Sequence, residues 1–372
     1  MADFLIDHLD PLGQGVSRRS NAKKQSVITF IPKTLPGEQG KARVIKSSKG
    51  VEFAELQSLS LSSSLRMAPE CPHYSDCAAC DYLHTSYENE IRFKQAALAF
   101  LLRQLPVEAG QIEVVAAPRR FAYRNRVQLH YRHKYLGYID ASGDRVLEVP
   151  HCRLPTARLK AEMDKLYGDK SWTLEHPGHG HVELYEKEDG SITTQWNQAY
   201  ASGGFTQVNT PMNDVLRSRL LQALADRQVA TLLDLFSGAG NLSDVLLAHP
   251  GLQRQLVDNS PAPTGLAGDE YVQLDLYAED ALQRYRRRQR FKQVDCLLLD
   301  PPRKGFMPLL EWTQHLQPAT VVYVSCNPAT LARDLQRVLK EQKKTAYRIQ
   351  KVLLLDMFPG TRHFETLVQL AS

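Results

Sequence analysis

The sequence lacks the features that mark membrane-spanning and secreted proteins. No stretch of its 372 residues approaches the roughly 18 uninterrupted apolar residues that a membrane-spanning helix needs. The first residues, MADFLIDHLDPLG, contain acids and lack the basic segment and apolar segment of a signal peptide. Apolar residues make up 43% of the chain and charged residues 23%, as in ordinary globular proteins. We therefore expect a cytoplasmic, membrane-free protein of two or three domains.

Cysteine is scarce, and half of the six cysteines lie in one short segment. The segment CPHYSDCAACDYLH (71–84) holds Cys71, Cys77 and Cys80, and the next cysteine, Cys152, lies far along the chain in EVPHCRLP. Cytoplasmic thiols stay reduced, so clustered cysteines there are more often metal ligands or catalytic groups than disulfides. Four thiolates suit either zinc or a 4Fe–4S cluster, and their spacing does not decide between the two. Either group would have a structural role, because it would tie two distant segments together.

Glycine, proline and apolar periodicity divide the chain into three blocks. Residues 1–62 contain short strand-like runs with turn residues roughly every 8–12 positions, which predicts a small β-barrel. Residues 63–204 are mixed α+β, with an amphipathic helix expected over 86–105 whose apolar face includes Ala96 and Leu98. Residues 205–372 alternate strands and helices, which predicts a doubly wound, Rossmann-like α/β sheet. Its strand candidates lie at 231–237, 254–259, 271–276, 294–300, 320–326, 346–358 and 364–372.

A glycine turn opens the last block. In LLDLFSGAGNLSDVLLAHP (232–250), Asp234 precedes a turn made by Gly238 and Gly240, and Asn241 is expected to open a helix. Asp258 ends the next strand, where an acid can bind ribose hydroxyls. The third glycine of the dinucleotide fingerprint is missing, and Asp234 would repel a pyrophosphate but attract a sulfonium or ammonium. The turn therefore favours S-adenosylmethionine over NAD, a merely structural turn being the remaining alternative.

Three later segments supply reactive groups at the ends of strands. LLLDPPRKG (297–305) ends a strand in Asp300, VVYVSCNPATLARDL (321–335) ends one in Cys326, and DMFPGTRHFETLVQL (356–370) places Glu365 before the last strand. A thiolate that adds to carbon 6 of uracil makes carbon 5 a nucleophile, and a base must then remove the carbon-5 proton. We predict Cys326 as the nucleophile and Glu365 as the base. Cys296, inside the run VDCLLLD, is predicted to be an inert buried thiol.

Two stretches interleave basic and aromatic residues. They are RYRRRQRFK (284–292) and PRRFAYRNRVQLHYRHKY (118–135), the second with Arg120, Arg124 and Arg126. Such patterns suit a polyanion whose bases can stack. A solvated helix face and a sheet surface are the alternatives, and a nucleic-acid enzyme further along the chain favours RNA.

Five motifs in order give the chain a resemblance to a known family. FTQVN (205–209), DLFSGAGN, DPPRKG, SCNPATLARDL and FPGTRHFET resemble those of the S-adenosylmethionine-dependent 5-methyluridine RNA methyltransferases. LDPLGQGV and TLPGEQGKARV are similar to the TRAM domain, and the four cysteines to the iron–sulfur site of the rRNA-modifying branch. The resemblance implies an OB-like TRAM barrel at 1–62, a central iron–sulfur domain at 63–204 and a class I methyltransferase domain with a seven-stranded sheet at 205–372. It also implies that the segment at about 83–116 packs on the catalytic domain.

The resemblance also implies functional residues. It assigns the cofactor pocket to Gln207, Phe236, Asn241, Asp258, Asp275 and Asp300, catalysis to Cys326 and Glu365, and the 4Fe–4S cluster to Cys71, Cys77, Cys80 and Cys152. The chain departs from the family's pattern at Ser237, where a cysteine is usual, and at Asp258, where a glutamate is usual. Residues 259–274 lack the family's asparagine-rich helix. These departures bear on cofactor affinity.

The implied activity is methylation of a uridine at carbon 5 within RNA. We expect 23S rRNA as the substrate, with tRNA as the alternative and a catalytically decayed RNA-binding iron–sulfur protein as a third possibility. The presence of both Cys326 and Glu365 argues against decay. The target base has to leave its stack to reach a thiol, so we expect base flipping. We expect a monomer.

Overall fold

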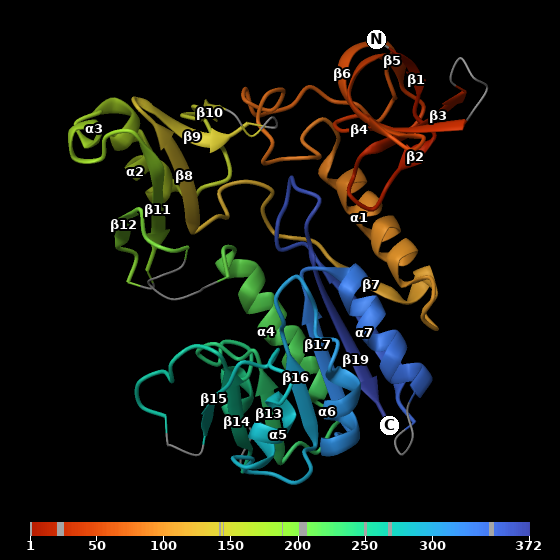
Figure 1. The fold of residues 1–372 in the computed structure, drawn as a ribbon, viewed down its shortest axis with the longest axis vertical. Coiled ribbons are helices and arrows are strands. Elements are labelled where there is room, and N and C mark those ends of the chain that lie inside the picture. The colour runs from red at the N-terminus through yellow and green to blue at the C-terminus, as the bar shows by residue number, and fades with distance from the viewer. Residues whose placement is uncertain are drawn as a thin grey trace. The chain divides into compact units, whose positions relative to one another are not determined.

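The computed structural model describes residues 2–20, 26–140, 143, 145–187, 189–200, 207–248, 251–266, 270–341 and 346–372. The first two residues of the FTQVN motif lie outside this range. The chain forms two compact units, coloured along its length in Figure 1. The first unit comprises Met1–Ala97, Ala117–Pro211 and Phe358–Arg362, and the second Leu98–Ala116, Met212–Met357 and His363–Ser372. Every helix in the described part of the chain is too short or too polar to cross a membrane.

The N-terminal part of the first unit is a six-stranded sheet, which confirms the strands predicted there. Its order is β1-β5-β6-β4-β3-β2, with bounds β1 Ala2–Leu5, β2 His8–Leu9, β3 Gly15–Ser20, β4 Ser26–Ile31, β5 Gln39–Ser48 and β6 Val51–Leu61. Alternate residues point inward, as the two-residue period of a strand requires. The inward side chains of Phe4, Ile31, Ala42 and Ala54 form a buried cluster.

A second sheet in the first unit has five antiparallel strands, in the order β10-β9-β8-β11-β12. The strands are β8 Arg126–Arg132, β9 Tyr135–Ile139, β10 Val146–Leu147, β11 His179–Glu186 and β12 Ile192–Trp196, and the helices are α2 Ala157–Gly168 and α3 Trp172–Glu175. The Thr156 hydroxyl caps α2 by accepting the Leu159 amide. Leu159 and Met163 then pack with Leu129 and Leu184 of the sheet.

Two of the arginines predicted to bind RNA are engaged inside the first unit instead. The side chain of Arg126 is 1% exposed and lies 3.0 Å from the Glu183 carboxylate. Arg120 is 13% exposed and pairs with the buried carboxylate of Glu90 at 3.0 Å. Both guanidinium groups are held by buried acids inside the first unit and not presented to a phosphate, so this part of the prediction is wrong.

Helix α1 (Tyr87–Leu102) confirms the predicted amphipathic helix, but its buried face differs from the expected one. Leu98 and Leu102 are buried as expected, whereas Ala96 is exposed. Glu90 and Lys94 occupy buried positions instead, and their charged groups pair at 2.7 Å. Apolar periodicity misses this pair because it assigns charged residues to the solvent side.

The second unit contains an eight-stranded sheet in the order β15-β14-β13-β16-β17-β19-β18-β7. Its strands are β7 Ile112–Val115, β13 Thr231–Leu235, β14 Gln253–Asp258, β15 Tyr271–Gln273, β16 Cys296–Leu299, β17 Thr320–Ser325, β18 Arg348–Leu355 and β19 Glu365–Ala371. The seven predicted strands are present, and the prediction of a seven-stranded sheet is wrong by one strand. The extra strand, β7, comes from far upstream and pairs with β18 in parallel.

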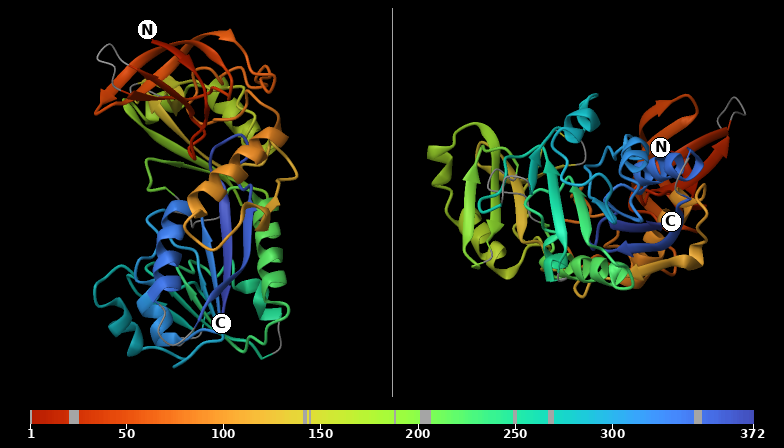
Figure 2. Two further views of the ribbon diagram at one scale, coloured as in Figure 1. Left: turned by 90° about the vertical axis from the view of Figure 1, so that its right-hand side faces the viewer. Right: turned by 90° about the horizontal axis from the view of Figure 1, so that it is seen from below.

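Helices cover both faces of this sheet. They are α4 Thr210–Leu224, α5 Ala281–Arg286, α6 Leu309–Leu316 and α7 Pro328–Glu341, with short 3-10 helices η1 Ala109–Gln111 and η2 Asp244–Ala248. Figure 2 shows α4 (green) and α7 (blue) on opposite sides of the strands. The run Leu297, Leu298 and Leu299 is wholly buried, as expected for a parallel strand covered on both faces.

Asp334 of α7 anchors the loop that follows β16. Its carboxylate accepts hydrogen bonds from the Phe306 amide at 2.6 Å and from the Tyr323 hydroxyl at 2.8 Å. Gly305 allows this approach, because a Cβ there would lie 2.6 Å from the Asp334 carboxylate. The loop carries Arg303 and begins at Asp300, so Asp334 fixes the backbone next to the sheet edge.

Replacing Asp334 with alanine should destabilise the second unit. The Tyr323 hydroxyl and the Phe306 amide would remain buried without an acceptor, at a cost of about 1–3 kcal/mol each. We expect urea unfolding to show a loss of about 3 kcal/mol in the free energy of unfolding. Glu311→Ala breaks an exposed ion pair with Arg337 and should cost less than about 1 kcal/mol. Equal losses in the two variants would contradict this role of Asp334.

Candidate active site

Strand order brings the predicted nucleophile and base to one edge of the eight-stranded sheet. Cys326 follows the last residue of β17, while Glu365 is the first residue of β19. The two strands are antiparallel neighbours, and Ser325 pairs with Thr366. The next position in this register brings Cys326 opposite Glu365. Asp300 follows β16, the neighbour of β17 on its other side, and so lies at the same edge.

The Cys326 thiol is surrounded by charged groups. Burial, together with the negative charges of Glu365 and Asp300, raises the pKa of the thiol to about 11. The Arg303 guanidinium opposes this shift, because it donates a hydrogen bond to the sulfur and carries a positive charge. A thiolate is the nucleophilic form of cysteine, so Arg303 favours the reactive state.

Glu365 has the properties of a general base. It is 4% exposed, and its Oε2 atom has no hydrogen-bond partner within the described residues. Burial and then the charge of Asp300 raise the pKa of Glu365 well above its ordinary value, while Arg303 acts in the opposite direction. Burial likewise raises the pKa of Asp300. A buried carboxylate with a raised pKa and an open oxygen can accept a proton from a bound molecule.

The glycine turn after β13 has an unusual backbone. Phe236 has a φ of +59°, Gly238 of +53° and Gly240 of +90°. A positive φ is a rare, strained conformation for an aromatic residue, and such strain is concentrated at ligand sites. The Phe236 ring packs against Tyr277 and Phe306, with centroids 5.4 and 5.1 Å away. A Cβ on Gly238 would meet no atom within 4 Å, so the space beside the turn is open.

Acidic groups surround this turn. Asp234 is buried beneath it and accepts a hydrogen bond of 2.6 Å from the Ser243 hydroxyl. Burial raises the pKa of Asp234 to about 7 against the effect of that hydrogen bond. Asp258 accepts the Gly238 amide at 2.9 Å with one carboxylate oxygen, which joins the end of β14 to the turn. The region is therefore suited to a ligand with positive charge.

The remaining predicted cofactor residues differ in how far the structure brings them together. Asn241 is exposed and lies in a turn, where its amide pairs with that of Asn213 at 3.0 Å. The prediction that a helix opens at Asn241 is wrong, because only the short 3-10 helix η2 follows, at Asp244–Ala248. Asp275 is exposed and accepts the Tyr277 amide at 2.9 Å. Gln207 belongs to the first unit, where its carbonyl accepts the side chain of Asn125 at 2.9 Å.

Sequence reasoning missed three side chains at the sheet edge. Arg303 contacts the thiol, Ser243 hydrogen-bonds to Asp234, and Tyr277 packs on Phe236. Arg303 has a sequence signal, since it lies three positions after Asp300 in DPPRKG. Ser243 and Tyr277 have none, because their partners are distant strands or loops.

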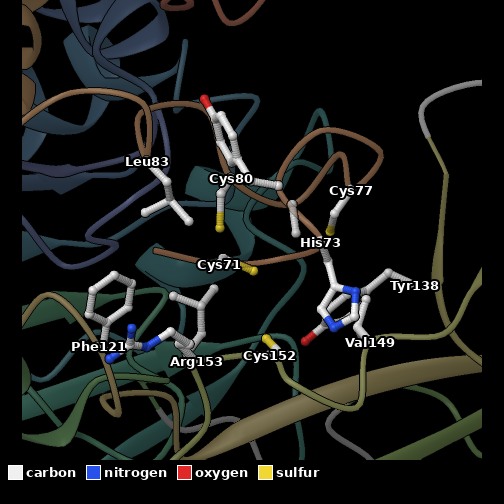
Figure 3. A pocket seen from close by; sticks show the side chains of 13 residues that line it. Cys71, His73, Cys77, Cys80, Leu83, Phe121, Tyr138, Val149, Cys152 and Arg153 are labelled. Atoms are coloured by element: carbon white, nitrogen blue, oxygen red, sulfur yellow. The ribbon is translucent and has the colours of Figure 1, made fainter. Parts of the chain in front are cut away.

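The four predicted metal ligands lie around one pocket in the first unit. Figure 3 shows the sulfur atoms of Cys71, Cys77, Cys80 and Cys152 facing a common space, with Leu83, Phe121, Tyr138 and Val149 among the other lining residues. All four cysteines are free of disulfides. Burial raises the pKa of the Cys77 and Cys152 thiols, and neighbouring cysteines add to the shift. Among the described residues, however, no group of three or more ligand side chains is arranged to hold a single metal ion.

Comparison with known proteins gives consistent similarities. A model of the tRNA (uracil-5-)-methyltransferase family matches residues 277–372. The 23S rRNA (uracil(1939)-C(5))-methyltransferase of Shewanella frigidimarina is 28% identical over 437 residues, which cover 98% of this chain and 94% of that protein. The enzyme of the same name from Shewanella sediminis is 28% identical over 432 residues, covering 97% and 94%.

A solved structure shares the fold. The tRNA (uracil-54, C5)-methyltransferase of Pyrococcus abyssi, determined with S-adenosyl-L-homocysteine, superposes with a TM-score of 0.71, 19% identity and 100% coverage of both chains. The parallel strands followed by an antiparallel β19 between β17 and β18 therefore form a class I methyltransferase sheet. With the family match over the segment that contains Asp300, Cys326 and Glu365, and the similarity along nearly the whole chain, the protein is similar to RNA uracil-C5 methyltransferases.

Proposed function

We propose that this protein transfers a methyl group from S-adenosylmethionine to carbon 5 of a uridine in RNA. The observation that carries the proposal is the register of β17 and β19, which brings the Cys326 thiol opposite the Glu365 carboxyl. The proposed substrate is 23S rRNA, because relatives that cover nearly the whole chain are named for it. A tRNA uridine is the second candidate, since the matching family model is described by tRNA.

The sheet edge fits the proposed cofactor. S-Adenosylmethionine, when bound, supplies a methyl group on a positively charged sulfur. Asp258 provides a carboxylate beside the turn, the buried Asp234 and Asp300 carry carboxyl groups whose pKa burial raises to about 7, and the open side of Gly238 leaves room. We propose that the cofactor is held by Gln207, Phe236, Asn241, Asp258, Asp275 and Asp300.

The proposed reaction begins with the Cys326 thiolate. Its sulfur forms a bond to carbon 6 of uracil, and the electron pair of the C5–C6 double bond moves into an enolate. Carbon 5 then takes the methyl group, and the electron pair of the broken S–CH3 bond stays on the departing sulfur. Glu365 removes the carbon-5 proton, the C5–C6 double bond re-forms, and the S–C6 bond breaks to return the thiolate. Glu365 passes the proton to solvent, so charge and atoms balance.

Methyl transfer should depend on Cys326 and not on the other cysteine of this sheet. With labelled S-adenosylmethionine and RNA from a strain lacking the enzyme, we expect label in 23S rRNA. Cys326→Ala should abolish transfer, because carbon 5 would no longer be activated. Cys296→Ala removes a thiol that is fully buried within β16, and should leave transfer within about threefold of wild type.

Label in tRNA alone would replace the proposed substrate with the second candidate. Transfer by Cys326→Ala would contradict the proposed nucleophile. Absence of transfer by the wild-type protein to both RNAs would contradict the proposed function.

Arg303 should set the pH dependence of the reaction. Since the pKa of Cys326 is raised to about 11 in the free protein, kcat/KM should rise with pH across about pH 6 to 9 as the thiolate fraction grows. Arg303→Ala removes a hydrogen bond and a charge that lower this pKa. The rising limb should therefore move to higher pH, and kcat/KM near pH 7 should fall about tenfold.

Lys304→Ala is the matched control for this shift. Lys304 is the neighbouring cation, and its ammonium lies over the Tyr277 ring, 3.2 Å from the centroid. Lys304→Ala should leave the rising limb of kcat/KM at the same pH as in the wild type. A loss of activity in Arg303→Ala that is the same at every pH would contradict the proposed effect on the thiol.

We also propose that Cys71, Cys77, Cys80 and Cys152 hold a 4Fe–4S cluster. The support is that all four thiols line one pocket. A zinc ion needs all its sulfur ligands about 2.3 Å from one point, but a cluster binds each cysteine through a different iron atom. The cluster would brace the first unit and take no part in methyl transfer, which moves no net electrons.

Metal analysis should distinguish the two alternatives. Protein purified without oxygen should contain about four iron atoms and four sulfides per chain. Cys152→Ala should lose iron and sulfide together, because Cys152 is the ligand contributed by the distant segment. One zinc atom per chain, with neither iron nor sulfide, would show that the proposed cluster is wrong.

The six-stranded sheet has a surface suited to RNA, and we propose that it is the TRAM barrel. Phe53 is 39% exposed and stacks on Phe30, with ring centroids 5.5 Å apart. Exposed Lys46 is the β5 partner of Phe53 in register. An aromatic surface beside a cation can stack a base and contact its phosphate. We further propose a cytoplasmic protein that acts as a monomer.

A further inference from the structure

The connection between β18 and β19 is built into the first unit, although both strands belong to the second. It comprises Phe358–Arg362, the FPGTR part of the fifth motif. Only His363 and Phe364 separate it from Glu365, the proposed base. Any group that fixes this connection therefore acts on the point where the chain enters β19.

Side chains and backbone of the first unit form hydrogen bonds with the connection at several positions. Gly360 is the centre of these contacts: its amide donates to the Glu90 carboxylate at 2.6 Å, and its carbonyl accepts the amides of Asp81 and Tyr82 at 2.9 and 3.1 Å. The Tyr123 hydroxyl donates to the Pro359 carbonyl at 3.0 Å. The connection therefore has polar partners on both its donor and its acceptor groups.

Further contacts involve the ends of the connection. The Lys94 ammonium donates to the Phe358 carbonyl at 3.3 Å. The Arg362 amide donates to the Asp81 carboxylate at 2.7 Å, and the side chains of the same two residues form an ion pair at 3.5 Å. Asp81 directly follows Cys80, so the cysteine segment is part of the same set of contacts.

Glycine at position 360 shows how closely the connection fits. Its φ is +82°, and a Cβ would lie 3.0 Å from the Leu83 side chain and 3.9 Å from the Cys80 sulfur. A larger residue would be strained in its backbone and crowded by Leu83. The connection is thus confined by packing as well as by hydrogen bonds.

The burial of the Glu90 carboxylate costs free energy of desolvation. The side chain of Glu90 is wholly buried, and it pairs with Lys94 at 2.7 Å and with Arg120 at 3.0 Å. Buried ion pairs add little stability compared with apolar packing of the same volume, because desolvation offsets their attraction. A role in fixing the geometry of Gly360 accounts for a charged group at this position.

We propose that Glu90 is a positioning residue for the base. By holding the Gly360 amide it fixes the entry into β19, and hence the orientation of the Glu365 carboxylate toward the carbon-5 proton. This inference rests on the proposed function. It assigns Glu90 to the last stage of the reaction, after carbon 5 has taken the methyl group, and gives it no part in binding RNA or in the attack by Cys326.

The test measures the covalent enzyme–RNA adduct. If proton removal slows, a methylated RNA bonded to Cys326 should accumulate, visible as labelled protein of reduced mobility on a denaturing gel. Glu365→Gln provides the reference, because it removes the base itself. We expect Glu90→Gln to lower turnover about ten- to hundredfold and to accumulate the adduct. Dissociation constants for RNA and S-adenosylmethionine should stay within about twofold of wild type.

Glu88→Gln is the matched control on the same helix. Glu88 is exposed and pairs with exposed Arg92, so this variant should turn over as wild type without adduct. Tyr123→Phe is the second test variant, since it removes only the hydroxyl that holds Pro359. It should accumulate adduct to a smaller extent, and it decides the question if Glu90→Gln does not fold.

The outcomes separate this inference from the proposed function. An inactive wild-type protein would overturn the function and the inference together. An active wild type with adduct in Glu90→Gln or Tyr123→Phe supports the positioning role. Variants that fold and turn over without adduct, as Glu88→Gln should, would overturn the positioning role and leave the function standing. If these variants differed from wild type solely in weaker RNA binding, the positioning role would likewise be overturned and the function would stand.

Discussion

The antiparallel insertion of β19 beside β17 is the constraint on which the proposed catalytic arrangement of Cys326 and Glu365 depends. In a sheet of parallel strands alone, all strands begin at one edge of the sheet and end at the opposite edge. The first residue of one strand therefore cannot lie beside the last residue of its neighbour. Reversal of β19 brings the beginning of one strand to the end of the other, and the pairing of Ser325 with Thr366 fixes the register. A slip by one residue would turn the Glu365 side chain to the opposite face.

Both units contain buried charged side chains. In the second unit, burial raises the pKa of Glu365 and of the Cys326 thiol, the charge of Asp300 adds to both shifts, and Arg303 provides the opposing charge. In the first unit, Glu90 lies between Lys94 and Arg120. Such groups are costly to bury, and their arrangement is sensitive to small movements because the local dielectric constant is low. The proposed reactivity of the thiol and the proposed positioning by Glu90 would both depend on charges buried in this way.

The sequence predicts most of the catalytic sheet because its strands are short apolar runs that end in chemically distinctive residues. Cys326 and Glu365 follow from that pattern and the demands of the reaction, and the family resemblance adds residues whose roles stay predictions. Three features were not predicted. They are β7, the 3-10 helix after Asn241 and the buried Glu90–Lys94 pair. The four residues of β7 carry no signal of the strand they pair with. Each of these three features depends on contacts between distant parts of the chain, which local periodicity does not encode.

The extra strand β7 has a consequence for how the chain can be divided. It covers the free edge of β18, whose residues Val352 to Leu355 are all buried. A fragment that began at Met212 would contain the other seven strands of this sheet and still expose this apolar edge, a template for aggregation. During synthesis, Ile112–Val115 would emerge from the ribosome long before the strand that it pairs with. Completion of the catalytic sheet is therefore a late, non-local event in folding, and such events are slow.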